Sequence, residues 1–356
     1  MHPLIVADEL SRKGNPLLFA MRSNTTMNER SQEKHFSRVA LPFRWYLDPR
    51  SYLPLRRLTK SRGINVIHVH CSRDTWRAIL LAGILRKSAV LVFSKHSGTP
   101  PSSNKRDPLH RLLVRRLDAM VANSQYIREN TLETYPIDPS KVKVIHYGLG
   151  GEAVGNPARA EEIRRELGGG RDSVLVGMVA SLSEGKRQDL FVRAAKRISG
   201  LHPECRFVIV GIPGQVAYAD KIREMIVTMG LERQVIMAGF LEDIPSLMQA
   251  LDVLVLPSNN EAFGIVLLEA MANSRAIVGS DSGAIPEIVR HGENGVLFPP
   301  GNAEALAKAI LQLIRSPEER VEMGEQGRRL FYERFYLDRE VADTEELYRS
   351  LLARRL

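Results

Sequence analysis

The chain has 356 residues with 50 Lys+Arg and 41 Asp+Glu, a net charge of +9, and its 44% hydrophobic and 26% charged residues are typical of a globular protein of about two domains. Its longest uncharged apolar run, residues 78–85, is far shorter than the ~20 residues that a membrane-spanning helix needs. The start lacks the pattern of a signal peptide, and two cysteines, Cys71 and Cys205, supply no disulfide framework, so we expect a cytoplasmic protein.

The charge is unevenly distributed along the chain. Residues 1–150 carry 25 Lys+Arg and 11 Asp+Glu, or +14, whereas the remainder carries 25 and 30, or −5. A basic first half favours an anionic partner such as nucleic acid, phospholipid head groups or a phosphorylated glycan. A solvated surface without a partner is the alternative interpretation.

The first half begins with a predicted helix. Residues 4–14, LIVADELSRKG, combine apolar positions with a glycine stop. A Rossmann-like domain normally opens with a strand and a glycine-bearing turn, so this domain is expected to lack its first strand. Short apolar runs that predict strands follow at 15–21, 64–70, 89–96, 118–124 and 141–148.

In the second half, predicted strands and helices alternate more regularly than in the first. Helices are predicted at 187–198 and 303–314, and the last stretch, 333–356, is also predicted to be helical. Strands that are apolar on both faces and alternate with amphipathic helices indicate a parallel sheet covered on both sides. We therefore predict an α/β protein of two doubly wound, Rossmann-like domains, 1–150 and 151–337, that face a cleft, with residues 338–356 packing back on the first. The strands of the second half are expected at 173–180, 206–211, 234–239, 252–257, 275–280 and 295–300.

One segment of the second half places two acids around an apolar helix. In NNEAFGIVLLEAMANS, Glu261 lies in the loop after a buried strand, and Glu269 lies a little over one turn inside the following helix. The amides of Phe263, Gly264 and Ile265 are expected at the helix N-terminus, where unpaired donors and the helix dipole favour an anion. The pattern indicates that a diphosphate binds to these amides. Glu261 and Glu269 would then accept hydrogen bonds from the hydroxyls of a sugar at either end of the diphosphate.

These residues resemble a known family, the retaining nucleotide-sugar glycosyltransferases of the GT-B fold, family four. EAFGIVLLE matches the E-x7-E signature of that family, and SDSGAIPEIVRHGENGVLFPPGN matches the segment that follows it. The resemblance extends from about residue 4 to the end and is strongest over 173–300. It implies that Glu261 contacts the transferred sugar, that the Phe263 and Gly264 amides hold sugar or phosphate, and that Glu269 binds the ribose hydroxyls.

The same resemblance implies further donor-binding residues in the loop ASLSEGKRQDL, residues 180–190. Lys186 falls on the lysine that grips the diphosphate in family members. Ser181 stands where many members have arginine, and Arg187 is a candidate substitute. Gly211, in GIPG after a strand, is expected to line the base pocket.

Histidines follow the strands of the first half. By resemblance, His96 at the end of residues 89–96 holds the donor sugar or the acceptor. His68 and His70 share one face of a strand by the period-two rule, but a zinc site needs a third ligand, and the sequence near them offers none at a recognisable spacing. We expect no zinc.

The expected reaction is transfer of a sugar from a UDP- or GDP-linked donor to a hydroxyl with retention, needing no cofactor and no metal. No Asp-x-Asp motif occurs, so the diphosphate charge would be met by Lys186, Arg187 and the helix N-terminus. No carboxylate is assigned to attack the anomeric carbon, which favours front-side transfer. The basic stretches 56–62, 103–107 and 110–116 suit docking on an anionic membrane leaflet, and hence a glycan or lipid-linked glycan of lipopolysaccharide or exopolysaccharide synthesis as acceptor.

Three rival interpretations remain open. A nicotinamide-dependent oxidoreductase would share the α/β rhythm, but its G-x-G-x-x-G fingerprint is absent. A non-catalytic protein that binds nucleotide sugars or partners on the same scaffold fits the expected loss of the first strand. A nucleic-acid-binding domain lacks any recognisable motif, so no nucleic acid is expected as partner.

Overall fold

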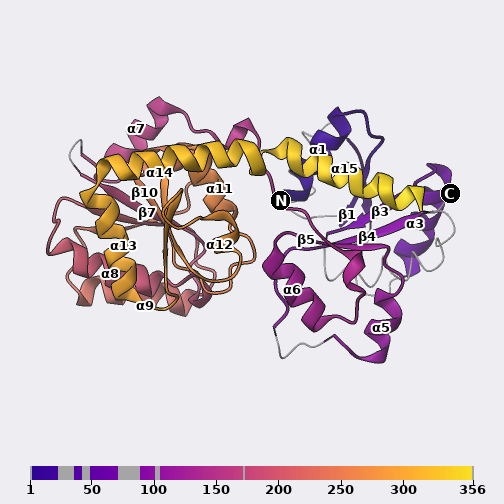
Figure 1. Ribbon diagram of the computed structural model, residues 1–356, viewed down its shortest axis with the longest axis horizontal. Coiled ribbons are helices and arrows are strands. Elements are labelled where there is room, and N and C mark those ends of the chain that lie inside the picture. The colour runs from indigo at the N-terminus through magenta and orange to yellow at the C-terminus, as the bar shows by residue number, and fades with distance from the viewer. Residues whose placement is uncertain are drawn as a thin grey trace. The chain divides into compact units, whose positions relative to one another are not determined.

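The structure, a computed structural model, describes residues 2–22, 36–41, 49–70, 89–100, 105–170 and 173–354. The chain divides into two compact units, which we name unit 1 (residues 1–147 and 337–356) and unit 2 (residues 148–336) (Figure 1). Every strand pairing in both units is parallel, as the apolar runs predicted. The α/β class with parallel sheets in two domains is therefore confirmed.

Unit 2 is built on a six-stranded sheet in the order β12-β11-β10-β7-β8-β9. The helices α8, α9 and α13 bury their apolar faces on one side of this sheet, and Met323 of α14 joins the same core. Helix α11 contacts β10 and β11, and α14 contacts β11 and β12. The strands are β7 (Leu175–Val179), β8 (Arg206–Val210), β9 (Val235–Gly239), β10 (Val253–Leu256), β11 (Ala276–Ser280) and β12 (Gly295–Phe298). The helices are α7 (Pro157–Glu166), α8 (Gln188–Ser199), α9 (Val216–Thr228), α10 (Ile244–Ala250), α11 (Ile265–Ala272), α12 (Ile285–Ile288), α13 (Ala303–Arg315) and α14 (Pro317–Leu330).

Unit 1 contains a four-stranded sheet in the order β3-β4-β5-β6 and a separate pair, β1-β2. β4 is buried along its whole length, and apolar residues of α15 pack on β4 and β5. The strands are β1 (Leu18–Arg22), β2 (Ser37–Leu41), β3 (Val66–Val69), β4 (Val90–Lys95), β5 (Ala119–Ala122) and β6 (Val142–Val144). The helices are α1 (His2–Arg12), α3 (Pro49–Ser61), α5 (Pro108–Val114), α6 (Gln125–Thr134) and α15 (Leu337–Ala353).

The start of unit 1 follows the sequence prediction. The first described element is α1, and Gly14 behind it has φ +86°, the left-handed conformation that ends helices. Strand β2 was missed because no apolar run marks it in the sequence. Its partner β1 falls where residues 15–21 predicted a strand.

The helix predicted over 333–356 is found in the described residues, but it is interrupted at residue 336. Residues Phe331–Phe335 form a π-helical turn that buries both phenylalanines. Tyr336 is extended and pairs with Leu149, whose amide donates to the Phe335 carbonyl at 3.0 Å. The α-helix starts only at Leu337, because the backbone at 336 is used in this pairing.

Candidate functional site

The loops after β7 and β10 lie where the strand order of unit 2 reverses. From β7 the chain proceeds to β8 and β9 at one edge, then returns to place β10 on the other side of β7. In open parallel sheets, ligands bind beyond the carboxyl ends of the strands at such a switch point. The loop after β7 carries Lys186, and the loop after β10 carries Glu261, so both candidate residues follow the two switch-point strands.

Main-chain hydrogen bonds tie these loops to their neighbours. The Asn259 amide donates to the Gly185 carbonyl at 2.9 Å, which links the β10 and β7 loops. The Ala284 amide donates to the Glu261 carbonyl at 2.8 Å, which links the β11 loop to the β10 loop. The Leu182 amide donates to the Ile212 carbonyl at 2.9 Å, which links the β7 loop to the β8 loop. Four loops thus form one connected layer at the carboxyl edge of the sheet.

Lys186 and Glu261 form an ion pair within this layer. The Lys186 Nζ lies 2.6 Å from the Glu261 Oε2, and their side chains are 31% and 12% exposed. No other protein partner of the Lys186 ammonium lies among the described residues, so part of its surface remains open to an anion. The pair holds both side chains next to the expected path of a donor diphosphate.

The helix that follows Glu261 starts at Ile265, as the sequence predicted. Its N-cap is Gly264, with φ +86°. Among the residues that the structure describes, none accepts a hydrogen bond from the amides of Gly264, Ile265 or Val266. Unpaired amides at a helix N-terminus suit an anion such as a phosphate.

The side chain of Phe263 packs in the core of unit 2. Its ring is 2% exposed and meets the Phe335 ring edge to face, with centroids 6.3 Å apart. Packing of this ring fixes the loop that presents Glu261 and Gly264. The ring itself is not part of the exposed site surface.

Glu269 stands on α11 without a partner. Its carboxylate is partly buried, and no described residue hydrogen bonds to it or pairs with it. Burial raises the pKa of Glu269 to about 7, because the charged form is poorly solvated there. A half-buried carboxyl without a protein donor is suited to accept hydrogen bonds from ligand hydroxyls.

The remaining donor-loop residues differ in availability. Arg187 is held by Asp189 through two hydrogen bonds of 2.9 and 3.0 Å, and its φ is +61°. Ser181 is exposed, and its carbonyl accepts from Gln188 at 3.0 Å. Gly211 is required sterically, since a Cβ there would lie 2.0 Å from the Ala180 carbonyl oxygen. Arg187 would have to leave Asp189 in order to meet a diphosphate.

His96 lies in unit 1, at the carboxyl end of β4, within a row of histidines. Its Nδ1 is hydrogen-bonded to the Tyr147 hydroxyl, and its Nε2 lies 3.4 Å from the His70 Nδ1. The rings of His70 and His96 stack at 5.5 Å, and those of His68 and His70 are 4.1 Å apart. Both nitrogens of His96 thus face protein groups, and this third histidine, which the sequence near His68 and His70 does not supply, comes directly after β4.

This row of imidazoles is held in the neutral form. Burial lowers the pKa of His68 to about 3 and that of His96 to about 4, with neighbouring histidines adding to the effect, and the pKa of His70 is also well below its usual value. His68 contacts the Tyr348 hydroxyl at 2.5 Å and the Ser94 hydroxyl at 2.7 Å. In the described parts of the chain, no group of three or more His, Cys, Asp or Glu side chains has an arrangement that could hold a metal.

Gly283, in the loop after β11, contacts the Glu261 loop closely, and it was not identified from the sequence. Gly283 has φ +61°, and a Cβ there would lie 2.5 Å from the Glu261 backbone nitrogen and oxygen. Beside it, the Ser282 hydroxyl accepts from the Asn260 amide at 3.1 Å. The only sequence signal was the segment SDSGA, which continues the double-acid motif.

Two family models together match most of the chain. Residues 3–149 match the model described as Glycosyltransferase Family 4, and residues 159–330 match the model described as Glycosyl transferases group 1. The boundary between the matches falls close to that between units 1 and 2.

Relatives with assigned names agree with the models. A lipopolysaccharide core biosynthesis mannosyltransferase of Rhizobium leguminosarum is 32% identical over 305 residues, which cover 85% of this chain and 83% of the relative. A D-inositol 3-phosphate glycosyltransferase of Corynebacterium glutamicum is 29% identical over 263 residues, or 71% of this chain, and the match spans 62% of that relative's length.

Solved structures share the fold. A glycosyltransferase of Rickettsia africae superposes with a TM-score of 0.87 at 19% identity, over 99% of this chain and 94% of that one. Anabaena HepE in complex with UDP-glucose superposes with a TM-score of 0.84 at 22% identity, over 98% and 95%. At these identities the likeness establishes the fold alone.

Proposed function

Because the chain belongs to the family of group 1 and family 4 glycosyltransferases, we propose that it moves a sugar from a UDP- or GDP-linked donor to a hydroxyl of a glycan or lipid-linked glycan. The two-domain α/β fold is that of GT-B glycosyltransferases. The observation that carries the proposal is the layer of loops in unit 2, where Lys186, Glu261 and the free amides of α11 surround one switch point.

Different residues would bind the diphosphate, the ribose, the sugar and the base of the donor. Its diphosphate would lie against the amides of Gly264 and Ile265 and the ammonium of Lys186, which together offer positive charge to the leaving group. The unpartnered carboxyl of Glu269 would accept hydrogen bonds from the ribose, and Glu261 would contact the transferred sugar. The base would lie near Gly211, whose amide donates to the carbonyl of Gly239 at 2.7 Å, next in sequence to the exposed Phe240.

Transfer would proceed with retention and without a metal ion or cofactor. Glu261 is paired with Lys186, so its carboxylate is engaged by a cation and is poorly suited to attack the anomeric carbon. We favour front-side attack, in which a donor phosphate oxygen takes the acceptor proton. Trapping of a covalent glycosyl adduct on Glu261 would contradict this step, and loss of activity in EDTA would contradict metal independence.

The acceptor is proposed from the named relative and from charge. The Rhizobium mannosyltransferase acts in lipopolysaccharide core biosynthesis, which supports a glycan or lipid-linked glycan acceptor. Within the described residues no helix has the length and apolar character needed to cross a bilayer. Arg111, Leu112 and Arg115 are exposed on or just after α5, and Leu112 is 53% exposed. This surface would dock on an anionic membrane leaflet from the cytoplasmic side.

One test addresses the donor directly. Thermal unfolding would be measured with UDP-, GDP- and ADP-linked sugars for the wild type and for Glu269→Ala. We expect one donor to raise the unfolding temperature of the wild type and to lose that effect in the variant. The anomeric configuration of the product would then be read by NMR, and salt-sensitive binding to anionic vesicles would test the docking surface.

A non-catalytic donor-binding protein is the second candidate. It is favoured by one observation: Arg187, the candidate substitute for the arginine that the family resemblance implies at Ser181, is held by Asp189. Donor binding without turnover on any glycan acceptor would support this candidate over the transferase.

A further inference from the structure

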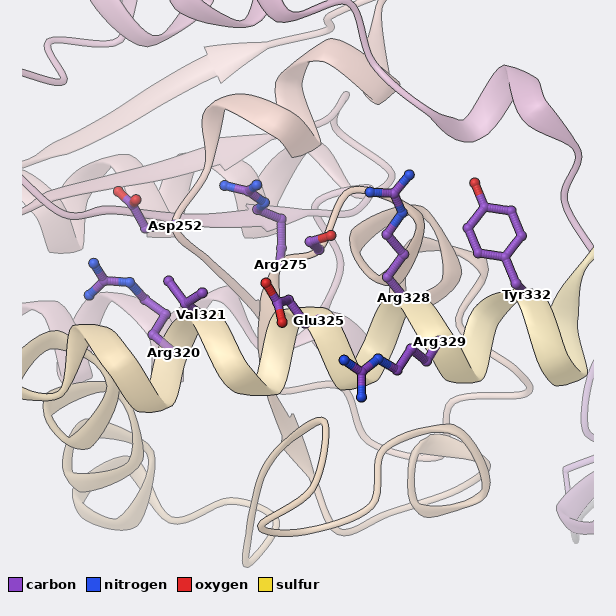
Figure 2. A pocket seen from close by; sticks show the side chains of 9 residues that line it. Asp252, Arg275, Arg320, Val321, Glu325, Arg328, Arg329 and Tyr332 are labelled. Carbon is purple, nitrogen blue, oxygen red and sulfur yellow. The ribbon is translucent and has the colours of Figure 1, made fainter.

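A groove of about 550 Å³ lies in unit 2 at the amino ends of β10 and β11 (Figure 2). The loops that carry Lys186 and Glu261 lie at the opposite, carboxyl ends of the strands. The groove is lined by Asp252 and Arg275, which come just before β10 and β11, and by side chains of α14. Gly324 lets α14 approach the turn that carries Arg275, because a Cβ there would lie 2.1 Å from the Ser274 carbonyl oxygen. A volume of this size is within the range of small-molecule sites.

Cations outnumber anions in the groove. Four arginines and two acids give a net charge of +2 (+4 − 2). These six residues are Arg275, Arg320, Arg328, Arg329, Asp252 and Glu325.

The acid at the base of the groove is already neutralised from outside. The Asp252 Oδ2 lies 2.9 Å from Arg164 Nη1, which does not line the groove, and it also accepts from the Leu175 amide at 2.7 Å. Asp252 is therefore unable to balance the charge of the lining arginines by itself.

The inner arginines are bound to uncharged acceptors. Arg275 donates to the carbonyls of Asn273 and Leu251 at 2.6 and 3.0 Å, and Arg320 donates to that of Leu313 at 2.8 Å. These bonds cap the ends of helices without supplying negative charge, and Asp252, which acts electrostatically on Arg275, is itself paired with Arg164. Burial lowers the pKa of Arg275, and the charges of Arg164 and Arg320 lower it further.

The outer wall combines a cation, a carboxylate and an aromatic ring on one helix and the turn after it. Arg328 lies over the Tyr332 ring at 5.8 Å, and Figure 2 shows both side chains pointing the same way. Tyr332 and Val321 are 47% and 58% exposed. Glu325 is exposed and forms no ion pair among the residues that the structure describes.

We propose that this groove binds a soluble sugar phosphate, separately from the donor site. The phosphate group would meet Arg275, Arg320 and Arg328, none of which forms an ion pair with a carboxylate among the described residues. The Glu325 carboxylate would repel a bare phosphate, but it would accept hydrogen bonds from sugar hydroxyls. The carbon face of the sugar would rest on Val321 and Tyr332.

The two sites are far enough apart to be measured independently. β10 and β11 are four and five residues long, so about 13–17 Å of strand separates the groove from the donor loops at ~3.3 Å per residue. Binding in the groove therefore needs neither Lys186 nor Glu269. Failure of the proposed transferase activity would leave this inference intact, and the reverse also holds.

The experiment is calorimetric titration of the full chain with glucose 6-phosphate and with inorganic phosphate at physiological salt. We expect Lys186→Ala to bind the sugar phosphate as the wild type does and Arg328→Ala to bind it at least tenfold more weakly. Arg193→Ala, an exposed arginine on α8, is the matched control and should bind normally. Glu325→Gln should weaken sugar phosphate binding while strengthening that of inorganic phosphate, a reversal that loss of folding would not produce.

Three outcomes would overturn the proposal. The first is equal binding by Arg328→Ala and the wild type, and the second is loss of binding in Lys186→Ala, which would move the ligand to the donor site. The third is binding of phosphatidylglycerol vesicles, lost in Arg328→Ala, without any binding of the soluble ligand. That result would assign the groove to a lipid surface.

Discussion

Lys186 and Glu261 meet at 2.6 Å although 75 residues separate them in sequence. They follow β7 and β10, the two strands between which the chain reverses its direction across the sheet. The contact joins a cation suited to a leaving diphosphate with an acid suited to a sugar.

Lys186→Ala should reduce kcat by about 10²–10³, because one group that stabilises the developing diphosphate charge is removed. Steady-state kinetics with the donor identified by thermal shift would measure this. Lys221→Ala, an exposed lysine on α9, is the matched control and should leave kcat unchanged. A Lys186→Ala enzyme with wild-type kcat would contradict the assigned role.

Glu269→Gln should stabilise the free protein at high pH and weaken donor binding. The pKa of Glu269 is raised to about 7, so its stabilising contribution is complete below about pH 4.5 and is lost as pH rises through 7. Glutamine never ionises, and the variant should gain up to roughly 3 kcal/mol above pH 7 at ~1.4 kcal/mol per pKa unit. Denaturant unfolding at pH 5 and pH 8 would measure the difference.

Glu224→Gln, on the exposed face of α9, serves as the control for this series and should show no such pH dependence. An equal stability of Glu269→Gln and wild type at pH 8 would show that the carboxyl is not desolvated.

Gly283→Ala should lower the unfolding temperature and impair donor binding. Two costs combine there: a positive φ of +61° and a Cβ only 2.5 Å from the Glu261 backbone. Gly292→Ala provides a matched control, because Gly292 has φ +81° with nothing within 4 Å of its Cβ position. The difference between the two variants in thermal unfolding and donor titration isolates the close approach to Glu261, and equal effects would refute its importance.

Unit 1 should lose stability in acid. The pKa values of His68 and His96 are lowered to about 3 and about 4, so the unfolded chain takes up protons below pH 6.5 while the folded imidazoles stay neutral. Stability is therefore present above pH 6.5 and falls towards pH 4, by at most about 1.4 kcal/mol per pH unit for each imidazole.

The measurement is unfolding of the wild type and His70→Gln between pH 7.5 and 4. The variant should show a shallower decline, because its row contains one imidazole fewer. His202→Gln, whose imidazole lies 3.1 Å from Glu204 in unit 2, should keep the wild-type profile. Identical profiles for all three proteins would show that the row does not set the acid sensitivity.

The predicted elements of unit 2 were all found, because its strands are apolar on both faces and the two predicted helices, α8 and α13, are amphipathic. The start of α11 at Ile265 was also predictable, since Gly264 marks the turn before it. In contrast, β2 lacks an apolar run, and the break at Tyr336 depends on pairing with Leu149, which is distant in sequence. Local patterns predict local structure, and they carry no signal for such long-range pairings.

The candidate site shows the same division. Spacing along the chain predicted that Glu261 lies in a loop and Glu269 on a helix, but it gave no sign that Asp189 would hold Arg187 or that His96 would join His68 and His70. Arg187 and Asp189 are two residues apart and meet through the turn that starts α8, whereas the histidine contact depends on which strands become neighbours in the sheet. The groove beside α14 was missed for the same reason, since its arginines come from segments that are separate in sequence.

The loops around the switch point are joined mainly through peptide groups, from Gly185 to Asn259 and from Glu261 to Ala284. Main-chain hydrogen bonds of this kind survive most substitutions of the side chains around them. Descendants of this scaffold could therefore acquire a different sugar or nucleotide preference by altering individual side chains, while the frame that carries them is inherited unchanged.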